Sequence, residues 1–174
     1  MMSESEQEEE KTEDLTLGLL LSPYSQVLAP PLNDNLQFHA FFMYHHSDRD
    51  WVLNVIEKLE SPALGFRCCC YERDLNSNLS QPQGILYGMK HSLKTIIILS
   101  PEFVSKMWTS CEAVIGDVDV ITLQKDFVLV LLSDCEVPDV LTMANFVRAN
   151  KQGWWTRFLA RLALPGKRPF TFYF

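Results

Sequence analysis

Residues 94–104 read KTIIILSPEFV, and this stretch decides the fold. Its central part, Thr95–Leu99, is short, uncharged and rich in β-branched residues, which is typical of a strand buried on both faces of a sheet. Ser100, Pro101 and Glu102 follow directly. Serine is a preferred helix cap, proline fits the first helical turn, and an acidic side chain is favoured at the positive end of the helix dipole. The stretch therefore predicts a buried strand that leads into a helix.

The same alternation of strand and helix signals continues on both sides of this stretch. Strands are predicted at residues 38–44, 66–70, 95–99 and 127–132. Helices are predicted after Ser47 or Asp48, from Pro82 to about His91, after Ser100, and over residues 152–163. Strands that alternate with helices build a doubly wound α/β sheet, here of about five parallel strands flanked by helices. Binding sites in such sheets lie beyond the carboxyl ends of the strands, where residues 72–81 form a predicted polar loop.

Charge is distributed unevenly along the 174 residues, whose net charge is −7. Residues 1–14 carry −6 of it, so the remainder is nearly neutral and does not favour nucleic acid as a partner. We expect residues 1–36 to form an acidic disordered tail and a proline-containing linker, and residues 37–174 to form the domain. No apolar run has the length of a transmembrane helix, and the acidic start is unlike a signal peptide. We therefore expect a cytoplasmic protein.

The five cysteines do not resemble a disulfide framework or a zinc site. Their number is odd, Cys68, Cys69 and Cys70 are consecutive, and no histidine lies at zinc-ligand spacing from them. We expect reduced, mostly buried thiols. His45 and His46 end the first strand, but the sequence supplies no further ligands, so we expect a polar loop and no metal. No glycine-rich phosphate loop, nucleophile elbow or HExxH motif is present.

Three short motifs occur in a fixed order along residues 37–165. An aromatic strand motif of the form F/Y-D-A-F-x-S-Y is matched by Phe38, Ala40, Phe41 and Tyr44. An R-D-x-x-P-G loop motif is matched by Arg73 and Asp74, and an F-W pair is represented by Trp154 and Trp155. In order and spacing the chain resembles the Toll/interleukin-1 receptor (TIR) domain family. The resemblance implies a flavodoxin-like fold in which Trp108 and the matched aromatic residues are structural.

Four positions depart from the family pattern. His39 replaces an aspartate, Met43 replaces a serine, and Ser77 and Asn78 replace the Pro-Gly pair of the loop. Without the proline, the free loop is more flexible, and ordering it costs about 0.4–1 kcal/mol more in chain entropy. Asparagine tolerates a left-handed backbone better than most residues, so we expect the loop to keep its path and to change its partner preference.

The resemblance implies that the chain binds other TIR domains through this loop. Its candidate partner-binding residues are Glu72, Arg73, Asp74, Leu75, Asn76, Ser77 and Asn78. In this interpretation Leu75 is the apolar tip of a mostly polar surface. The expected partners are the TIR domains of Toll-like and interleukin-1 receptors and of their adaptors, or a second copy of the chain. The implied role is that of an adaptor or regulator in innate immune and inflammatory signalling, without catalysis or a cofactor.

Alternative interpretations remain open at several of these positions. Arg73 and Asp74 can form a local ion pair that only shapes the loop, and we expect one of the two tryptophans to be in the core and the other partly covered. Some TIR proteins cleave NAD with a glutamate, and Glu112, four residues after Trp108, is the weak catalytic candidate here. The leucines within residues 15–36 can dock on the domain or on a membrane, although few basic residues accompany them.

Overall fold

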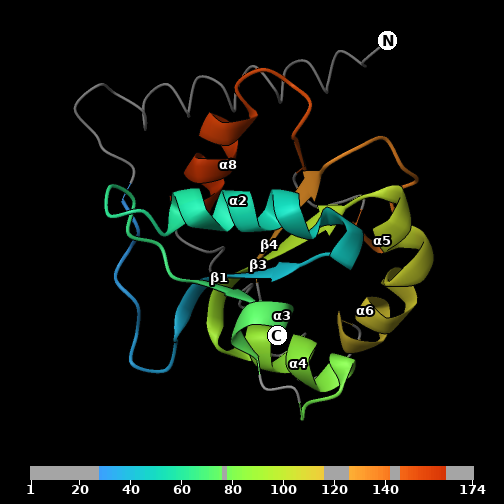
Figure 1. The fold of residues 1–174 in the computed structure, drawn as a ribbon, viewed down its shortest axis with the longest axis horizontal. Coiled ribbons are helices and arrows are strands. Elements are labelled where there is room, and N and C mark those ends of the chain that lie inside the picture. Colours follow the sequence, from blue (N-terminus) through green and yellow to red (C-terminus); the bar gives the residue numbers. More distant parts are fainter. Residues whose placement is uncertain (1–27, 76–77, 116–125, 142–145, 164–174) are drawn as a thin grey trace, which may run out of the picture.

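A computed structural model describes residues 28–75, 78–115, 126–141 and 146–163. It confirms the predicted doubly wound sheet, which has five parallel strands in the order β2-β1-β3-β4-β5 (Figure 1). The acidic tract at residues 1–14, and residues 15–27 of the predicted linker, lie outside the described residues. The strands are β1 (Phe38–Met43), β2 (Cys68–Cys70), β3 (Ser92–Leu99), β4 (Asp126–Leu131) and β5 (Phe146–Arg148).

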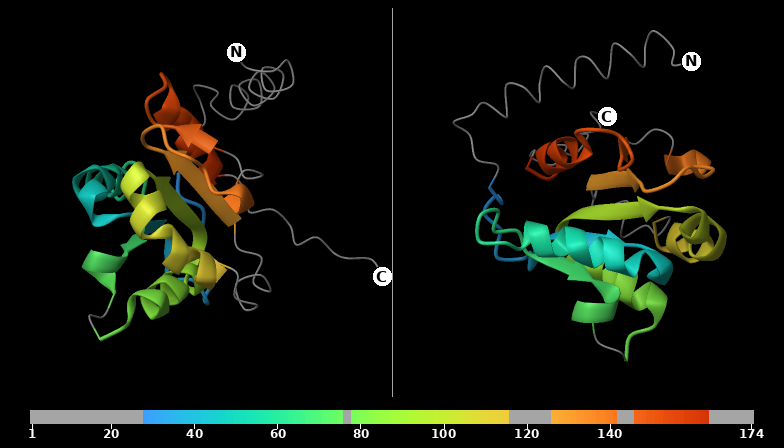
Figure 2. Two further views of the ribbon diagram at one scale, coloured as in Figure 1. Left: turned by 90° about the vertical axis from the view of Figure 1, so that its right-hand side faces the viewer. Right: turned by 45° about the horizontal axis from the view of Figure 1, so that its top comes forward.

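Helices cover both faces of the sheet. One face carries α2 and α8, and the other carries α4, α5 and α6 (Figures 1 and 2). The helices are α2 (Arg49–Leu59), α3 (Tyr71–Asp74), α4 (Gln81–Lys90), α5 (Pro101–Lys106), α6 (Trp108–Ile115) and α8 (Trp154–Ala163). Two 3₁₀ turns, η1 (His46–Asp48) and η2 (Asp139–Leu141), complete the described elements.

Alternate residues of the central strands point into two separate cores. In β1, Ala40 and Phe42 face α2 and α8, whereas Phe41 and Met43 face α4 and α5. Because successive side chains of a strand point to opposite faces, a strand covered on both sides must be apolar throughout. This explains why the strand at 95–99 is the clearest in the sequence. Lys94 at the start of this run is also buried, and its Nζ donates a hydrogen bond to the Arg161 carbonyl in α8.

One helix cap is confirmed as predicted, a second forms at a residue that is not among the predicted caps, and a third lies at a predicted position without its capping bond. The Ser100 hydroxyl accepts a hydrogen bond of 3.2 Å from the Phe103 N–H, which confirms the predicted cap. Ser80 caps α4 in a reciprocal box with Gln83. Asp48, one of the two residues after which a helix is predicted, does occupy the N-cap position of α2, but it makes no side-chain cap bond; its carboxylate accepts a hydrogen bond of 2.6 Å from the Ser100 hydroxyl instead. This bond joins the first helix to the carboxyl end of β3.

The described part of the N-terminal linker is attached to the domain. The Ala29 N–H donates to the Leu64 carbonyl at 2.9 Å. His39, which stands where the family motif has aspartate, lies 2.7 Å from the Pro30 carbonyl through Nε2, and its Nδ1 accepts 2.9 Å from the Arg67 N–H. Since the nitrogen that accepts carries no proton, the ring is neutral with its proton on Nε2. His39 therefore fastens this segment to the start of the sheet.

We expect His39 to make stability depend on pH. The side chain is only 6% exposed, and burial lowers its pKa, as does the neighbouring Arg67 charge. Between the lowered pKa of His39 in the folded chain and about pH 6.5, the unfolded chain binds more protons than the folded one, so stability falls on acidification through this window by up to about 1.4 kcal/mol per pH unit. Urea unfolding between pH 5 and 7.5 should show this slope, and His39→Gln should reduce it. Equal slopes for wild type and His39→Gln would contradict the assignment, with His46→Gln at an exposed position as control.

Candidate docking surface

The residues after β2 form a helical turn and not the loop that the sequence predicts from Glu72 onward. The turn, α3, is closed by a bond of 3.4 Å from the Leu75 N–H to the Tyr71 carbonyl. The Asp74 carboxylate accepts a hydrogen bond of 2.9 Å from the Cys70 N–H, so this backbone group at the start of the turn has a partner. Of the predicted docking residues, Asn76 and Ser77 lie outside the described residues, and Asn78 is exposed.

Arg73 is held by three contacts within the domain. Its guanidinium lies 2.6 Å from the Glu60 carboxylate and 3.0 Å from that of Asp74, and it donates 2.9 Å to the Cys68 carbonyl. Partial burial lowers the pKa of Arg73, but the hydrogen bonds and charges of the two carboxylates outweigh burial and raise it above its usual range. The local ion pair that the sequence left open is therefore present. The side chain still has 38% of its surface exposed, so a partner can also reach it.

Glu72 and Leu75 differ in their availability to a partner. The Glu72 carboxylate lies 2.8 Å from the Arg49 guanidinium of α2, and both side chains are substantially exposed. Leu75 is half-buried against the core under α4 and is not the exposed apolar tip that the sequence predicts. Gly84 of α4 packs against the same helical turn, and it must be glycine because a Cβ there would lie 2.1 Å from the Tyr71 ring. The exposed surface of α3 is therefore charged.

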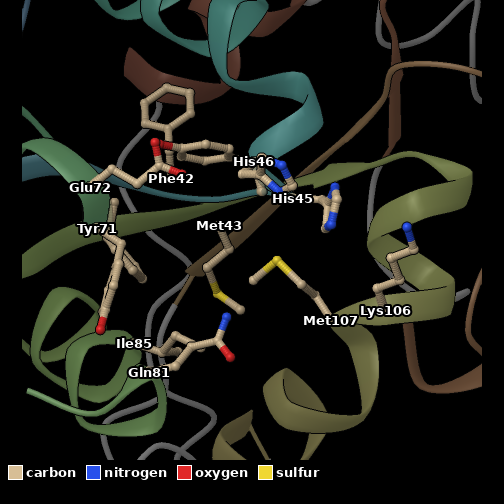
Figure 3. Close-up of a pocket in the computed structure, with 12 residues that line it drawn as sticks. Phe42, Met43, His45, His46, Tyr71, Glu72, Gln81, Ile85, Lys106 and Met107 are labelled. Carbon is tan, nitrogen blue, oxygen red and sulfur yellow. The ribbon is translucent and has the colours of Figure 1, made fainter.

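A cavity of about 330 Å³ lies beside α3 at the carboxyl end of β1 (Figure 3). Tyr71 and Glu72 form one side of it, and Lys106 and Met107 lie on the other. Its lining is completed by Phe41, Phe42, Met43, Tyr44, His45, His46, Gln81 and Ile85. The cavity thus combines an apolar floor with a charged rim, at the edge where doubly wound sheets present their binding residues.

The two histidines at this edge differ in their burial and in their contacts. His45 is buried and its Nδ1 lies 2.7 Å from the Ser47 hydroxyl, while His46 is exposed and its ring centre lies 4.6 Å from that of His45. Within the described ranges, no three side chains of the His, Cys, Asp and Glu types are grouped as a metal site would require.

Most of the chain matches a known protein family. The model of the TIR domain matches residues 41–163. The chain belongs to the TIR domain family. Drosophila melanogaster Toll is 25% identical over 148 residues, covering 79% of this chain, and human Toll-like receptor 1 is 38% identical over 82 residues, covering 47%. The chain covers only 13% and 10% of those two proteins.

Solved structures have the same fold. The TIR domain of a Toll-related receptor from Hydra magnipapillata superposes with a TM-score of 0.62 at 22% identity, covering 74% of this chain and 100% of that one. A TIR-STING receptor from C. gigas gives 0.61 at 20% identity, covering 79% and 44%. None of the helices in the described part of the chain combines the length and apolar character needed to cross a bilayer.

Glu112, the alternative catalytic candidate, lies apart from the cavity. It is exposed on α6, and the predicted four-residue spacing from Trp108 does fall within one helix. Trp108 is half-buried and packs on the core beneath α4, α5 and α6. Glu112 does not line the described cavity, so the residues seen there do not join it in a common site.

The paired tryptophans of the TIR domain have a packing role. Both are half-buried, so the expectation that one is in the core and the other partly covered is wrong. Trp154 lies 5.5 Å from Trp51 of α2 between ring centres, and Lys58 of α2 lies 5.7 Å from the centre of the Trp155 ring. The pair therefore joins α8 to α2, and α2 covers part of each indole.

The cysteines are all free in the structure, as expected. Four are buried and Cys135 is half-buried. Burial raises the pKa of Cys69 and of Cys111 to about 12, so these thiols are protonated at neutral pH and poor nucleophiles.

The sequence missed two residues of this surface, Arg49 and Glu60. Both lie on or next to α2, far in sequence from the Arg-Asp motif, and only the fold brings them to α3. No local pattern identifies them, because each is an ordinary charged residue on a helix surface.

Proposed function

We propose that this chain is a cytoplasmic adaptor or regulator in Toll-like and interleukin-1 receptor signalling, acting in innate immune and inflammatory responses. It binds TIR domains of receptors and adaptors, and it can also associate with itself. Family membership and the relationship to Toll and Toll-like receptors support this role. The chain acts by binding, with no catalytic step and no cofactor; the exposed position of Glu112, away from the cavity, favours this over NAD cleavage.

The observation that carries the proposal is the exposed charge of α3. Helices cover both sheet faces, which leaves loops and helix surfaces for partners. Glu72 is 33% exposed, Arg73 is 38% exposed, and Arg49 beside them is 53% exposed. A small surface of this kind suits a weak, polar interface that gains strength when several copies assemble. We name the surface formed by these three residues and Asn78 the α3 surface.

We expect Glu72→Arg to weaken binding to a partner TIR domain at least about five-fold, because reversing a charge places like charges against a complementary partner. The measurement is titration of the full chain with the TIR domain of human Toll-like receptor 1 at about 0.1 M salt. The exposed ion pair with Arg49 contributes little to folding, so stability should change by less than about 1 kcal/mol.

Glu57→Arg is the matched control. Glu57 is also an exposed glutamate, but it lies on α2, and this variant should bind like wild type. The same loss in both variants would show a general charge effect, and unchanged binding of Glu72→Arg would refute docking through the α3 surface.

A further inference from the structure

The outer edge of β2 is closed by side chains. β2 is the last strand of the sheet and pairs with β1 on one side only. An edge strand presents unpaired backbone groups, which can recruit another strand. Here outward-facing backbone groups of β2 are hydrogen-bonded to side chains. The Cys68 N–H donates a hydrogen bond of 3.3 Å to the Glu60 carboxylate, and the Cys68 carbonyl accepts one of 2.9 Å from the Arg73 guanidinium. The Cys70 N–H donates one of 2.9 Å to the Asp74 carboxylate. Three charged side chains thus occupy the places of a neighbouring strand.

Glu60 is the member of this group that joins separate elements. It follows the last residue of α2, and its carboxylate contacts both the β2 backbone and, at 2.6 Å, the Arg73 guanidinium of α3. The helix dipole disfavours a negative charge at a helix carboxyl end. Helix preference therefore does not explain a glutamate here, whereas the two contacts do.

Arg73 is held through Glu60 in a defined orientation. The guanidinium lies between the end of α2, the edge of β2 and the Asp74 carboxylate. Glu72, the preceding residue, pairs instead with Arg49 at the start of α2. Without the Glu60 carboxylate, Arg73 keeps only partners from its own α3–β2 unit, and the exposed ion pair between Glu72 and Arg49 is left to join α3 to α2.

We propose that Glu60 is a positioning residue for docking: it closes the edge of β2 and, through Arg73, holds α3 so that the α3 surface faces a partner. The docking half of this inference rests on the proposed function. The edge-closing half does not, because it concerns hydrogen bonds within this chain alone.

Amide hydrogen exchange of the full chain, resolved by residue, tests the inference together with affinity for the Toll-like receptor 1 TIR domain. In Glu60→Gln the size is kept and the charge is lost. We expect the Cys68 and Leu75 amides to exchange at least about ten-fold faster, amides at the centre of β3 to be unchanged, and binding to weaken at least about five-fold. Glu57→Gln, an exposed position on the same helix, should change neither readout.

The possible outcomes distinguish the edge-closing part of the inference from its docking part. Unchanged exchange at Cys68 and Leu75 in Glu60→Gln would overturn the inference. Faster exchange with wild-type affinity would show that Glu60 closes the edge but does not position the α3 surface, which overturns the proposal. If the wild-type chain binds no TIR domain, the proposed function fails, while faster exchange would still support edge closure. Arg73→Lys provides a second variant: a lysine keeps the charge but loses the forked geometry, and it should also accelerate exchange at Leu75.

Discussion

Phe41→Ala is expected to lower the free energy of unfolding by about 3–5 kcal/mol, which is the usual cost of removing a buried aromatic ring. Phe41 lies in the middle of β1, is 1% exposed, and packs between the sheet and α4. The helix comes this close because residue 88 is glycine: a Cβ there would lie 2.4 Å from the Phe41 ring. Gly88→Ala alone should therefore cost about 1–3 kcal/mol through overpacking.

The two substitutions should not be additive. In the Phe41→Ala chain the ring is gone, so the Gly88→Ala methyl group fills part of the cavity, and alanine favours the helix by about 1 kcal/mol over glycine. The same substitution that destabilises wild type should then stabilise the Phe41→Ala background. Urea unfolding of the four chains measures this as a double-mutant cycle. Additive effects would show that the ring and the helix are not in contact as described.

Arg73→Ala should have the largest effect on binding, with a loss of at least about ten-fold. The substitution removes an exposed charge from the α3 surface and also leaves Glu60, Asp74 and the Cys68 carbonyl without their shared donor. The stability cost should be about 1–2 kcal/mol: three partners lose their donor, but the side chain is 38% exposed and water can replace part of what is lost.

Comparison of Arg73→Ala with Glu72→Arg separates direct contact with the partner from support of the α3 turn. Glu72→Arg should weaken binding with little change in stability, whereas Arg73→Ala should affect both. Titration with the partner TIR domain and urea unfolding of the same samples give the two readouts. Wild-type affinity in Arg73→Ala would mean that neither its charge nor its support of α3 matters for docking.

Predictions from sequence succeed for this chain where a residue's role depends on its neighbours in the chain. The strand at 95–99 and the cap at Ser100 are local signals, and both are present. β5, Phe146–Arg148, has no clear signal in the sequence, because only the middle one of its three residues is buried and the last is charged. The sequence predicts a loop where α3 forms, because this single turn is stabilised by contacts of Asp74 with the Cys70 N–H and of Arg73 with Glu60, which belongs to another element.

The contacts around Arg73 are predictable from the sequence only in part, for the same reason. The Arg-Asp motif lies on α3, and the ion pair between its two residues is local. The partners Arg49 and Glu60, and the half-burial of Leu75 on Gly84, depend on how α2 and α4 pack, which no short window of sequence reports. The tryptophan pair was misjudged likewise, because Trp51 and Lys58 of α2 cover both rings.

The most direct test of docking through α3 is the footprint of a partner. Amide exchange or NMR shifts of the full chain are recorded as the Toll-like receptor 1 TIR domain is added. We predict that the changes centre on α3, Tyr71–Asp74, together with Asn78 and the first turn of α4, and that α6 around Glu112 and α8 are unaffected. A footprint on α6 or α8 that leaves α3 unchanged would contradict the assignment of this surface.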